Sequence, residues 1–150
     1  MQETKKERVA VVTGAGGTLC SEMARELAGQ GIKVALVGRT LEKLQKVESQ
    51  IKNKGGTAIS VSADVADEES IKNAHKVINR ELGPASILIN GAGGNQFPAI
   101  TTVNEFDEKE LFDDSDIKGF FNIEINSFLS VININTMGTV IPCHIFGKDM

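Results

Sequence analysis

Short apolar runs alternate with longer amphipathic stretches through the first half of this chain. Continuous apolar runs at residues 9–12, 34–37 and 87–89 are typical of strands that are buried on both faces of a sheet. Around Ile59 and Val61, apolar residues alternate with small polar ones, which predicts one more strand. The chain is therefore expected to supply four strands.

The stretches between these strands have helical periodicity and recognisable ends. They predict helices at residues 19–30, 41–51 and 71–82, with Thr40 and Asp67 as N-caps of the second and third. Glycines follow all three stretches, and glycine commonly ends a helix. The first helix is expected to bury a stripe made of Leu19, Cys20, Met23, Ala24, Leu27 and Ala28.

Alternation of strands and helices is typical of an α/β fold. The pattern predicts a doubly wound parallel sheet of the Rossmann type, with helices on both faces, in one domain spanning residues 1–150.

The chain after the fourth predicted strand is harder to interpret. Residues 107–116 are acidic, so we expect a solvated loop or a short helix there. Residues 128–145 are rich in Ile and Val, and β-propensity alone favours a strand at residues 130–134. The order of elements favours a helix instead, because a parallel strand is normally followed by one. We choose the helix, although Gly138 and Pro142 are unfavourable inside it.

Composition argues against several classes of function. A net charge of −4 and a pI of about 5.2 do not suit a partner such as nucleic acid or an anionic membrane surface. Seven Phe without Trp or Tyr offer few platforms for base stacking, and no uninterrupted apolar run reaches the ~20 residues of a membrane span. Cytoplasmic location is the expectation.

The cysteines and histidines show no arrangement that points to chemistry. Cys20, Cys143, His75 and His144 lack metal-ligand spacing, so no metal site is expected. Neither histidine has an evident catalytic partner. We expect Cys143 to be a small core or interface residue.

The most informative segment is residues 13–20, which reads Thr-Gly-Ala-Gly-Gly-Thr-Leu-Cys directly after the first predicted strand. A glycine-rich turn between a strand and a helix presents backbone N–H groups and a helix N-terminus to a phosphate. This order predicts a dinucleotide site whose diphosphate lies against the main chain of the turn. The alternative is a plain strand–helix turn.

Four motifs in order resemble those of the short-chain dehydrogenase/reductase family, over nearly the whole chain. They are the turn at residues 13–20, Ala63-Asp64-Val65, Asn90-Gly91-Ala92-Gly93, and Asn135 with Gly138 three residues later. The turn departs from the family's Thr-Gly-x-x-x-Gly-x-Gly, because Thr18 and Cys20 occupy the positions of its later glycines. Cys20 is small enough for a close helix–strand approach, whereas Thr18 has less backbone freedom than glycine.

The resemblance implies roles for these residues. Pyrophosphate contacts would come from the turn, from Gly14, Gly16, Gly17, Thr18 and Leu19. Contacts near the ribose would come from the loop after the fourth strand, from Asn90, Gly91, Ala92 and Gly93. Asp64 would accept a hydrogen bond from the adenine amino group, with Val65 beside it, and Asn135 would hold a water in a catalytic proton relay. The alternatives are a turn cap for Asp64 and a hydrogen bond within its own helix for Asn135.

Arg39 follows the second strand, at the position that reads the adenosine ribose. An acid there favours NAD, and an Arg favours the 2′-phosphate of NADP. Because the chain has Gly38-Arg39 and no acid at this point, we expect NADP as the cofactor, with NAD as the alternative. Arg39 as a solvated loop cation is the other interpretation.

Within the family, the turn, the loop at residues 91–95 and residues 141–150 look closest to D-mannonate oxidoreductase and gluconate 5-dehydrogenase-like members. Those members act on sugar acids, which implies an NAD(P)-dependent oxidoreductase with a sugar-acid substrate. The family's catalytic Ser and Tyr-x-x-x-Lys match nothing in these 150 residues. The chain is therefore expected to be the cofactor-binding half of the fold, truncated after the fourth strand–helix unit and inactive alone.

A non-catalytic nucleotide-binding module, or an inert truncated product, is the alternative to an enzyme. In either case the fourth strand would lie at an edge of the sheet where the family has a neighbour. Unpaired apolar edges tend to recruit another chain, so we expect self-association as a homo-oligomer.

Overall fold

The computed structural model describes residues 7–112 and 114–150. A parallel four-stranded sheet forms its centre, with strand order β3-β2-β1-β4. The strands are β1 (Val9–Thr13), β2 (Lys33–Gly38), β3 (Ala58–Ser62) and β4 (Ile87–Ile89). These are the four predicted strands, and the arrangement confirms the Rossmann-type α/β fold.

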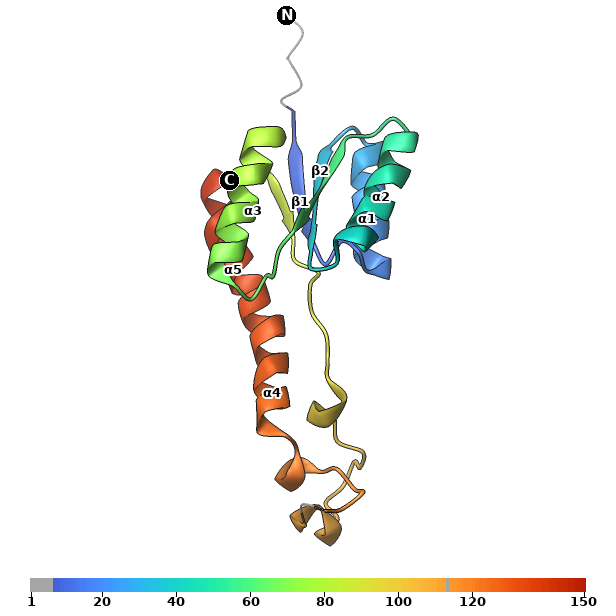
Figure 1. Cartoon of the computed structure of the whole chain (residues 1–150), viewed down its shortest axis with the longest axis vertical. Coiled ribbons are helices and arrows are strands. Elements are labelled where there is room, and N and C mark those ends of the chain that lie inside the picture. The colour runs from blue at the N-terminus through green and yellow to red at the C-terminus, as the bar shows by residue number, and fades with distance from the viewer. Residues whose placement is uncertain (1–6, 113) are drawn as a thin grey trace, which may run out of the picture.

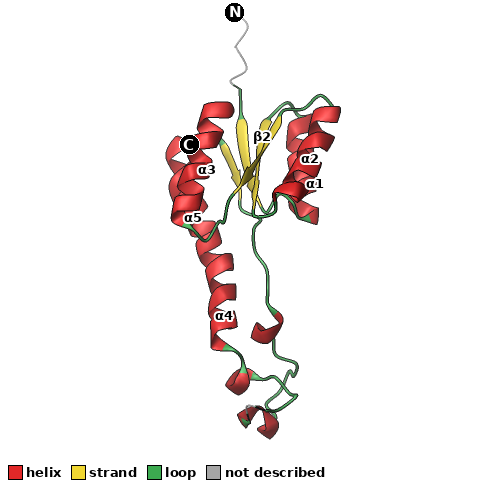
Figure 2. Cartoon of the chain, viewed as in Figure 1, coloured by secondary structure: helices red, strands yellow, loops and turns green. Residues whose placement is uncertain are grey.

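Helices cover both faces of the sheet (Figures 1 and 2). On one face lie α1 (Thr18–Gly29) and α2 (Leu41–Asn53), and on the other lie α3 (Glu68–Glu81) and α5 (Gly138–Phe146). Successive side chains of β1 point to opposite faces, so Val12 joins the core under α1 and α2, and Val11 joins the core under α3 and α5. All five residues of β1 are buried for this reason.

β1 occupies the interior of the sheet and β4 occupies an edge. β1 pairs with β2 on one side, with Val11 opposite Ala35, and with β4 on the other, with Val11 opposite Leu88. The three residues of β4 are only partly buried. The expectation of β4 at an edge is therefore confirmed.

The buried face of α1 differs from the predicted stripe. Leu19 is 75% exposed and Met23 is 45% exposed. The small members of that stripe, Cys20, Ala24 and Ala28, are buried as predicted, and Ser21 is buried with them. Small side chains allow the helix axis to approach the sheet closely, so the larger residues are left facing outward.

One predicted N-cap is confirmed and the other is only partly so. The Asp67 side chain accepts hydrogen bonds from the amides of Glu69 and Ser70 at the start of α3. Thr40 occupies the N-cap position of α2 but makes no side-chain capping hydrogen bond. The residue type predicts where a helix N-cap lies. The capping hydrogen bond forms only if the side chain also adopts a suitable rotamer.

The choice of a helix for the last segment is confirmed. α4 (Ile125–Ile132) continues through a π-helical turn, Asn133–Met137, into α5 and a final 3₁₀ turn, Gly147–Asp149. Gly138 lies so close to the sheet layer that a Cβ there would be 2.8 Å from Val65 Cγ2. The glycine that looked unfavourable for a helix is therefore what lets this helix pack.

The segment between β4 and α4 extends past the carboxyl ends of the strands, alongside α4 (Figure 1). It contains short 3₁₀ helices at Phe97–Ala99, Glu108–Leu111 and Phe120–Asn122. The second of these confirms a short helix in the acidic segment. Its Glu110 is buried and accepts hydrogen bonds from two backbone amides, those of Asp107 and Phe121.

The continuous helix Ile125–Asp149 is long and apolar enough, by length and composition, to cross a membrane. Polar residues interrupt its sequence, so no uninterrupted apolar run marks it. Helices from the cores of soluble proteins also meet this criterion, and the finding is weak evidence for a membrane.

Candidate functional site

The turn after β1 meets the turn after β4 at the carboxyl edge of the sheet. Gly14 has φ of +66°, a conformation that side chains other than glycine rarely adopt. A Cβ on Gly14 would lie 2.6 Å from the Gly91 carbonyl oxygen and 2.8 Å from the Ala92 nitrogen. Only glycine therefore fits where these two backbones cross.

The side chain of Thr13 stabilises the crossing of these two turns by hydrogen bonds. Its buried hydroxyl oxygen accepts hydrogen bonds from the amides of Gly91 at 3.1 Å and Ala92 at 3.2 Å. The hydroxyl donates to the Ile89 carbonyl at 3.5 Å. The last residue of β1 thus fixes the path of the chain as it leaves β4.

A groove of about 200 Å³ opens above this crossing. Strand order reverses between β1 and β4, and open α/β sheets bind ligands at such a point. Eight of the predicted site residues line the groove together: Gly14, Gly17, Arg39, Asp64, Val65, Gly91, Ala92 and Gly93. Gly38 and Ala63, which neighbour the predicted residues Arg39 and Asp64, also line it, and so does Ile134, which was not predicted. Ile134 comes from the distant α4–α5 joint, so no local motif could have indicated it.

The start of α1 supplies free backbone donors beside this groove. The Ser21 amide makes the first intrahelical bond, to the Gly17 carbonyl at 2.9 Å. The amides of Thr18 and Leu19 precede it in the helix and are available to an anion. Thr18 begins a regular helix, and no non-glycine residue in the described part of the chain has positive φ. The substitution of Thr for glycine therefore imposes no strained backbone here.

Gly16 and Thr18 face a second hollow, of about 760 Å³, between α1 and α2. Gly16 lies against Lys43, where an added Cβ would be 3.0 Å from the lysine Cβ. Arg25, Lys46 and Lys54 also line this hollow, which gives it a basic character.

Arg39 and Asp64 line the groove from the ends of β2 and β3. Both also line an adjoining hollow of about 360 Å³ that reaches α4. Asp64 Oδ1 accepts a hydrogen bond from the Ala66 amide at 3.0 Å, so the turn-cap bond is present, and a contact of Asp64 with adenine stays a prediction. Arg39 is exposed. Its position allows contact with a ligand in either hollow.

Asn135 lies in the π-helical turn and contacts the loop after β4. Its Nδ2 donates to the carbonyls of Gly94 at 2.7 Å and Val131 at 2.8 Å. A Cβ on Gly93 would lie 2.6 Å from Asn135 Oδ1. The hydrogen bond within its own helix is therefore present, and a role for Asn135 in a proton relay stays a prediction.

The two cysteines differ in environment. Cys20 is buried, which raises the pKa of its thiol, and its Sγ would be 2.0 Å from a Cβ on Gly91. The predicted close approach at Cys20 is confirmed. Cys143 is exposed, so it is not a core residue, and its alternative assignment to an interface stays a prediction. Its sulfur accepts a hydrogen bond from Asn90 Nδ2 at 3.1 Å.

His75 has a carboxylate partner that sequence proximity does not reveal. Its Nε2 lies 3.0 Å from Asp149, and its ring packs edge-on against Phe146. Asp149 also accepts a hydrogen bond from the Ala85 amide at 3.2 Å. These contacts fasten the end of the long helix to α3 and to the start of β4. Among residues 7–112 and 114–150, no cluster of His, Cys, Asp or Glu is suited to a metal ion.

Comparison with known proteins gives one family match. The family described as short chain dehydrogenase matches residues 8–150. An uncharacterized oxidoreductase of Bacillus subtilis, UxuB, is 41% identical over 150 residues, which are all of this chain and 52% of that protein. An uncharacterized oxidoreductase of Haemophilus influenzae is 37% identical over 145 residues, covering 97% of this chain and 50% of its own length.

Two solved structures with the same arrangement contain a bound nicotinamide cofactor. A Haemophilus influenzae protein described as a candidate D-mannonate oxidoreductase, with bound NAD, superposes with a TM-score of 0.86 at 37% identity. The match covers 95% of this chain and 50% of that one. A metagenomic short-chain oxidoreductase with NADP has a TM-score of 0.77 at 25% identity, covering 95% and 56%. The chain thus spans about half the length of the relatives it matches.

Proposed function

This chain belongs to the short-chain dehydrogenase family, and we propose that it binds a nicotinamide dinucleotide at the carboxyl edge of its sheet. The observation that carries the proposal is the crossing of Gly14 and Gly91. It leaves main-chain amides and the start of α1 facing a groove at the point where strand order reverses. Relatives solved with NAD and with NADP support the ligand class.

Different residues of the groove would contact different parts of the dinucleotide. The amides at the start of α1 would hold the diphosphate, and Asp64 and Val65 would lie against the adenine. Arg39 would pair with a 2′-phosphate through its guanidinium, which favours NADP over NAD. Gly91 to Gly93 would let the backbone approach the ribose. The residues present therefore fit a dinucleotide.

We propose that the full reaction is hydride transfer to or from a sugar acid. The bound nicotinamide supplies the hydride chemistry, and Asn135 would position a water near it. Support for the substrate class comes from the sequence resemblance and from the relative described as a candidate D-mannonate oxidoreductase. The 150 residues contain no Tyr, and general acid/base chemistry in the family depends on one. We therefore expect no turnover by this chain alone. Measurable oxidation of D-mannonate or gluconate, or reduction of the corresponding keto acids, by the purified 150-residue chain would contradict this expectation.

Titration with NADPH and NADH tests the binding proposal. The chain has no Trp or Tyr, so the fluorescence of the reduced nicotinamide can be followed without interference from these residues. We expect saturable binding of NADPH, weakened about tenfold or more in Arg39→Ala, because a charge-assisted hydrogen bond is lost. NADH affinity should change little in this variant.

Arg80→Ala is the matched control, since Arg80 is an exposed arginine on α3 that pairs with the adjacent Glu81. It should leave both affinities unchanged. Absence of saturable binding of either cofactor to the wild-type chain would refute the proposed function. Equal loss of NADH and NADPH in Arg39→Ala would refute the preference for NADP.

We further propose a cytoplasmic homo-oligomer. The partly buried edge strand β4 and the exposed apolar residues of α4, such as Ile125 and Leu129, support self-association. The free thiols of Cys20 and Cys143 suit a reducing compartment. A monomer in sedimentation equilibrium at high protein concentration would contradict the oligomer.

A further inference from the structure

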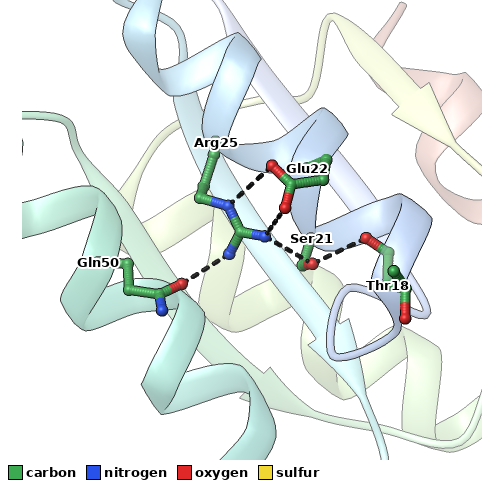
Figure 3. Close-up of polar contacts among 5 residues, drawn as sticks. All are labelled: Thr18, Ser21, Glu22, Arg25 and Gln50. Carbon is green, nitrogen blue, oxygen red and sulfur yellow. Dashed lines mark hydrogen bonds and ion pairs between the residues drawn. The ribbon is translucent and has the colours of Figure 1, made fainter.

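Arg25, on the second turn of α1, is at the centre of a hydrogen-bond network between α1 and α2 (Figure 3). Its guanidinium donates to both Glu22 carboxylate oxygens, at 2.5 and 3.3 Å, and to Gln50 Oε1 at 2.6 Å. It also donates to the Ser21 hydroxyl at 2.9 Å. Four of the five N–H donors of an arginine are therefore in use. The Arg25 side chain is only 20% exposed, and its bond to Ser21 is the part-buried one of the four, whereas the bonds to Glu22 and Gln50 face solvent.

The network reaches the first residue of the helix through Ser21. The Ser21 hydroxyl donates to the Thr18 carbonyl at 3.0 Å (Figure 3). A hydroxyl has one proton, and its lone pair here accepts from Arg25. The guanidinium therefore directs that proton toward Thr18. Ser21 is buried, which makes the link costly to break.

Thr18 belongs to the turn that carries the proposed diphosphate site. The Gly17 amide donates to Gly14, and the Ser21 amide donates to Gly17, both at 2.9 Å. These two backbone bonds and the side-chain bond of Ser21 hold the same short segment. From the α2 side, the Lys43 stem lies against Gly16. The turn is thus supported by both helices.

We propose that Arg25 is a positioning residue for the diphosphate-binding turn, acting through Ser21 on Thr18 and anchored on α2 by Gln50. The inference rests on the proposed function. Arg25 does not line the groove of the proposed dinucleotide site, so its effect would be exerted through Ser21. It holds the amides at the start of α1 in the orientation that an anion requires. The turn therefore loses little conformational entropy when the ligand binds.

Four variants separate this role from simple stabilisation. Arg25→Met removes the guanidinium and keeps an unbranched side chain, and Arg25→Lys keeps the charge without the fork of donors. Ser21→Ala breaks the link to Thr18 but leaves the bonds to Glu22 and Gln50 possible. Lys52→Met is the matched control, because Lys52 makes an ion pair with Glu48 on α2 and lies outside the network.

The first measurement compares NADPH with 2′-AMP, which lacks the 5′-diphosphate. We expect NADPH affinity to fall about five- to tenfold in both Arg25→Met and Ser21→Ala, consistent with loss of one hydrogen-bond link. Arg25→Lys should not restore it, and the double variant should lose no more than either single one. Affinity for 2′-AMP should stay within about twofold in every variant, and Lys52→Met should behave as wild type.

The second measurement is amide hydrogen exchange in the free chain, which needs no ligand. Arg25→Met should speed exchange at Gly17 and Ser21 and leave Val11 in β1 unchanged. Unchanged NADPH affinity, or equal losses for NADPH and 2′-AMP, would overturn the positioning role. If wild-type protein binds neither ligand, the proposed function fails, and exchange alone decides whether Arg25 holds the turn. Unchanged exchange at Gly17 and Ser21 would then overturn the inference, and faster exchange confined to them would support it.

Discussion

The side chain of Asn135 makes a reciprocal pair of hydrogen bonds with the backbone of Gly94. Its Nδ2 donates to the Gly94 carbonyl at 2.7 Å, and its Oδ1 accepts from the Gly94 amide at 3.3 Å. The π-helical turn that contains Asn135 is thereby tied to the loop that leaves β4, and this loop borders the groove. One amide side chain thus connects the joint of the long helix to the site.

Replacement of Asn135 by Ala should loosen this connection. We expect the free energy of unfolding in urea to fall by about 1 kcal/mol, as is usual for a lost hydrogen bond of this kind. Exchange of the Gly94 amide should become faster. Asn133→Ala is the control, because no side-chain hydrogen bond of Asn133 is found among the described residues. Equal effects of the two substitutions would contradict the structural role of Asn135.

Substitution of Gly91 by Ala should destabilise the chain by steric conflict with Cys20. The added Cβ would lie 2.0 Å from Cys20 Sγ, and overpacking of this kind costs about 1–3 kcal/mol. Cys20→Ala should relieve much of the conflict, so the double variant should be more stable in urea than the sum of the single effects predicts. Gly29→Ala should be harmless, since nothing lies within 4 Å of its Cβ position. Strict additivity at Gly91 and Cys20 would argue against their contact.

Removal of the Asp149 carboxylate should release the end of the long helix. Asp149→Ala leaves the Ala85 amide without its acceptor and removes the contact with His75 Nε2, and the Asp149 side chain is only 12% exposed. We expect a loss of about 1–3 kcal/mol of unfolding free energy. Lys148→Ala, at the exposed neighbouring position, should change stability little. Equal free energies of unfolding for Asp149→Ala and Lys148→Ala would show that the contact with His75 does not stabilise the chain.

Stability should fall at alkaline pH because of Cys20. Burial raises the pKa of its thiol above the ordinary value of 9.0, so the unfolded chain loses this proton before the folded chain does. The stabilisation is present below about pH 9 and is lost as pH rises through the folded pKa. Urea midpoints measured from pH 7 upward should therefore decline more for wild type than for Cys20→Ala.

Cys143→Ala provides the comparison, since it removes an exposed thiol in place of the buried one. The chain has no Tyr to titrate in the same range, which simplifies the result. Cys143 should also react with a thiol reagent in the native state before Cys20 does. Identical alkaline profiles for wild type and Cys20→Ala would show that burial of the thiol has no effect on stability.

Much of the site could be predicted from sequence because most of its residues come directly after strands in the chain. Parallel strands bring their carboxyl ends to one edge, so motifs after β1, β3 and β4 had to meet. Gly14, Asp64 and Gly91 were found in this way. Ile134 and the Arg25 network could not be found, since they depend on how one helix lies against another.

The sequence by itself determined the order of strands and helices, the parallel sheet and the glycine-rich turn, because these follow from local periodicity and backbone freedom. Only the tertiary structure decided that α1 buries Cys20 rather than Leu19, that Cys143 is exposed, and that Asp149 reaches His75. Those outcomes depend on distances between elements that are remote in the chain. Close packing sets these distances, and no short stretch of sequence encodes them.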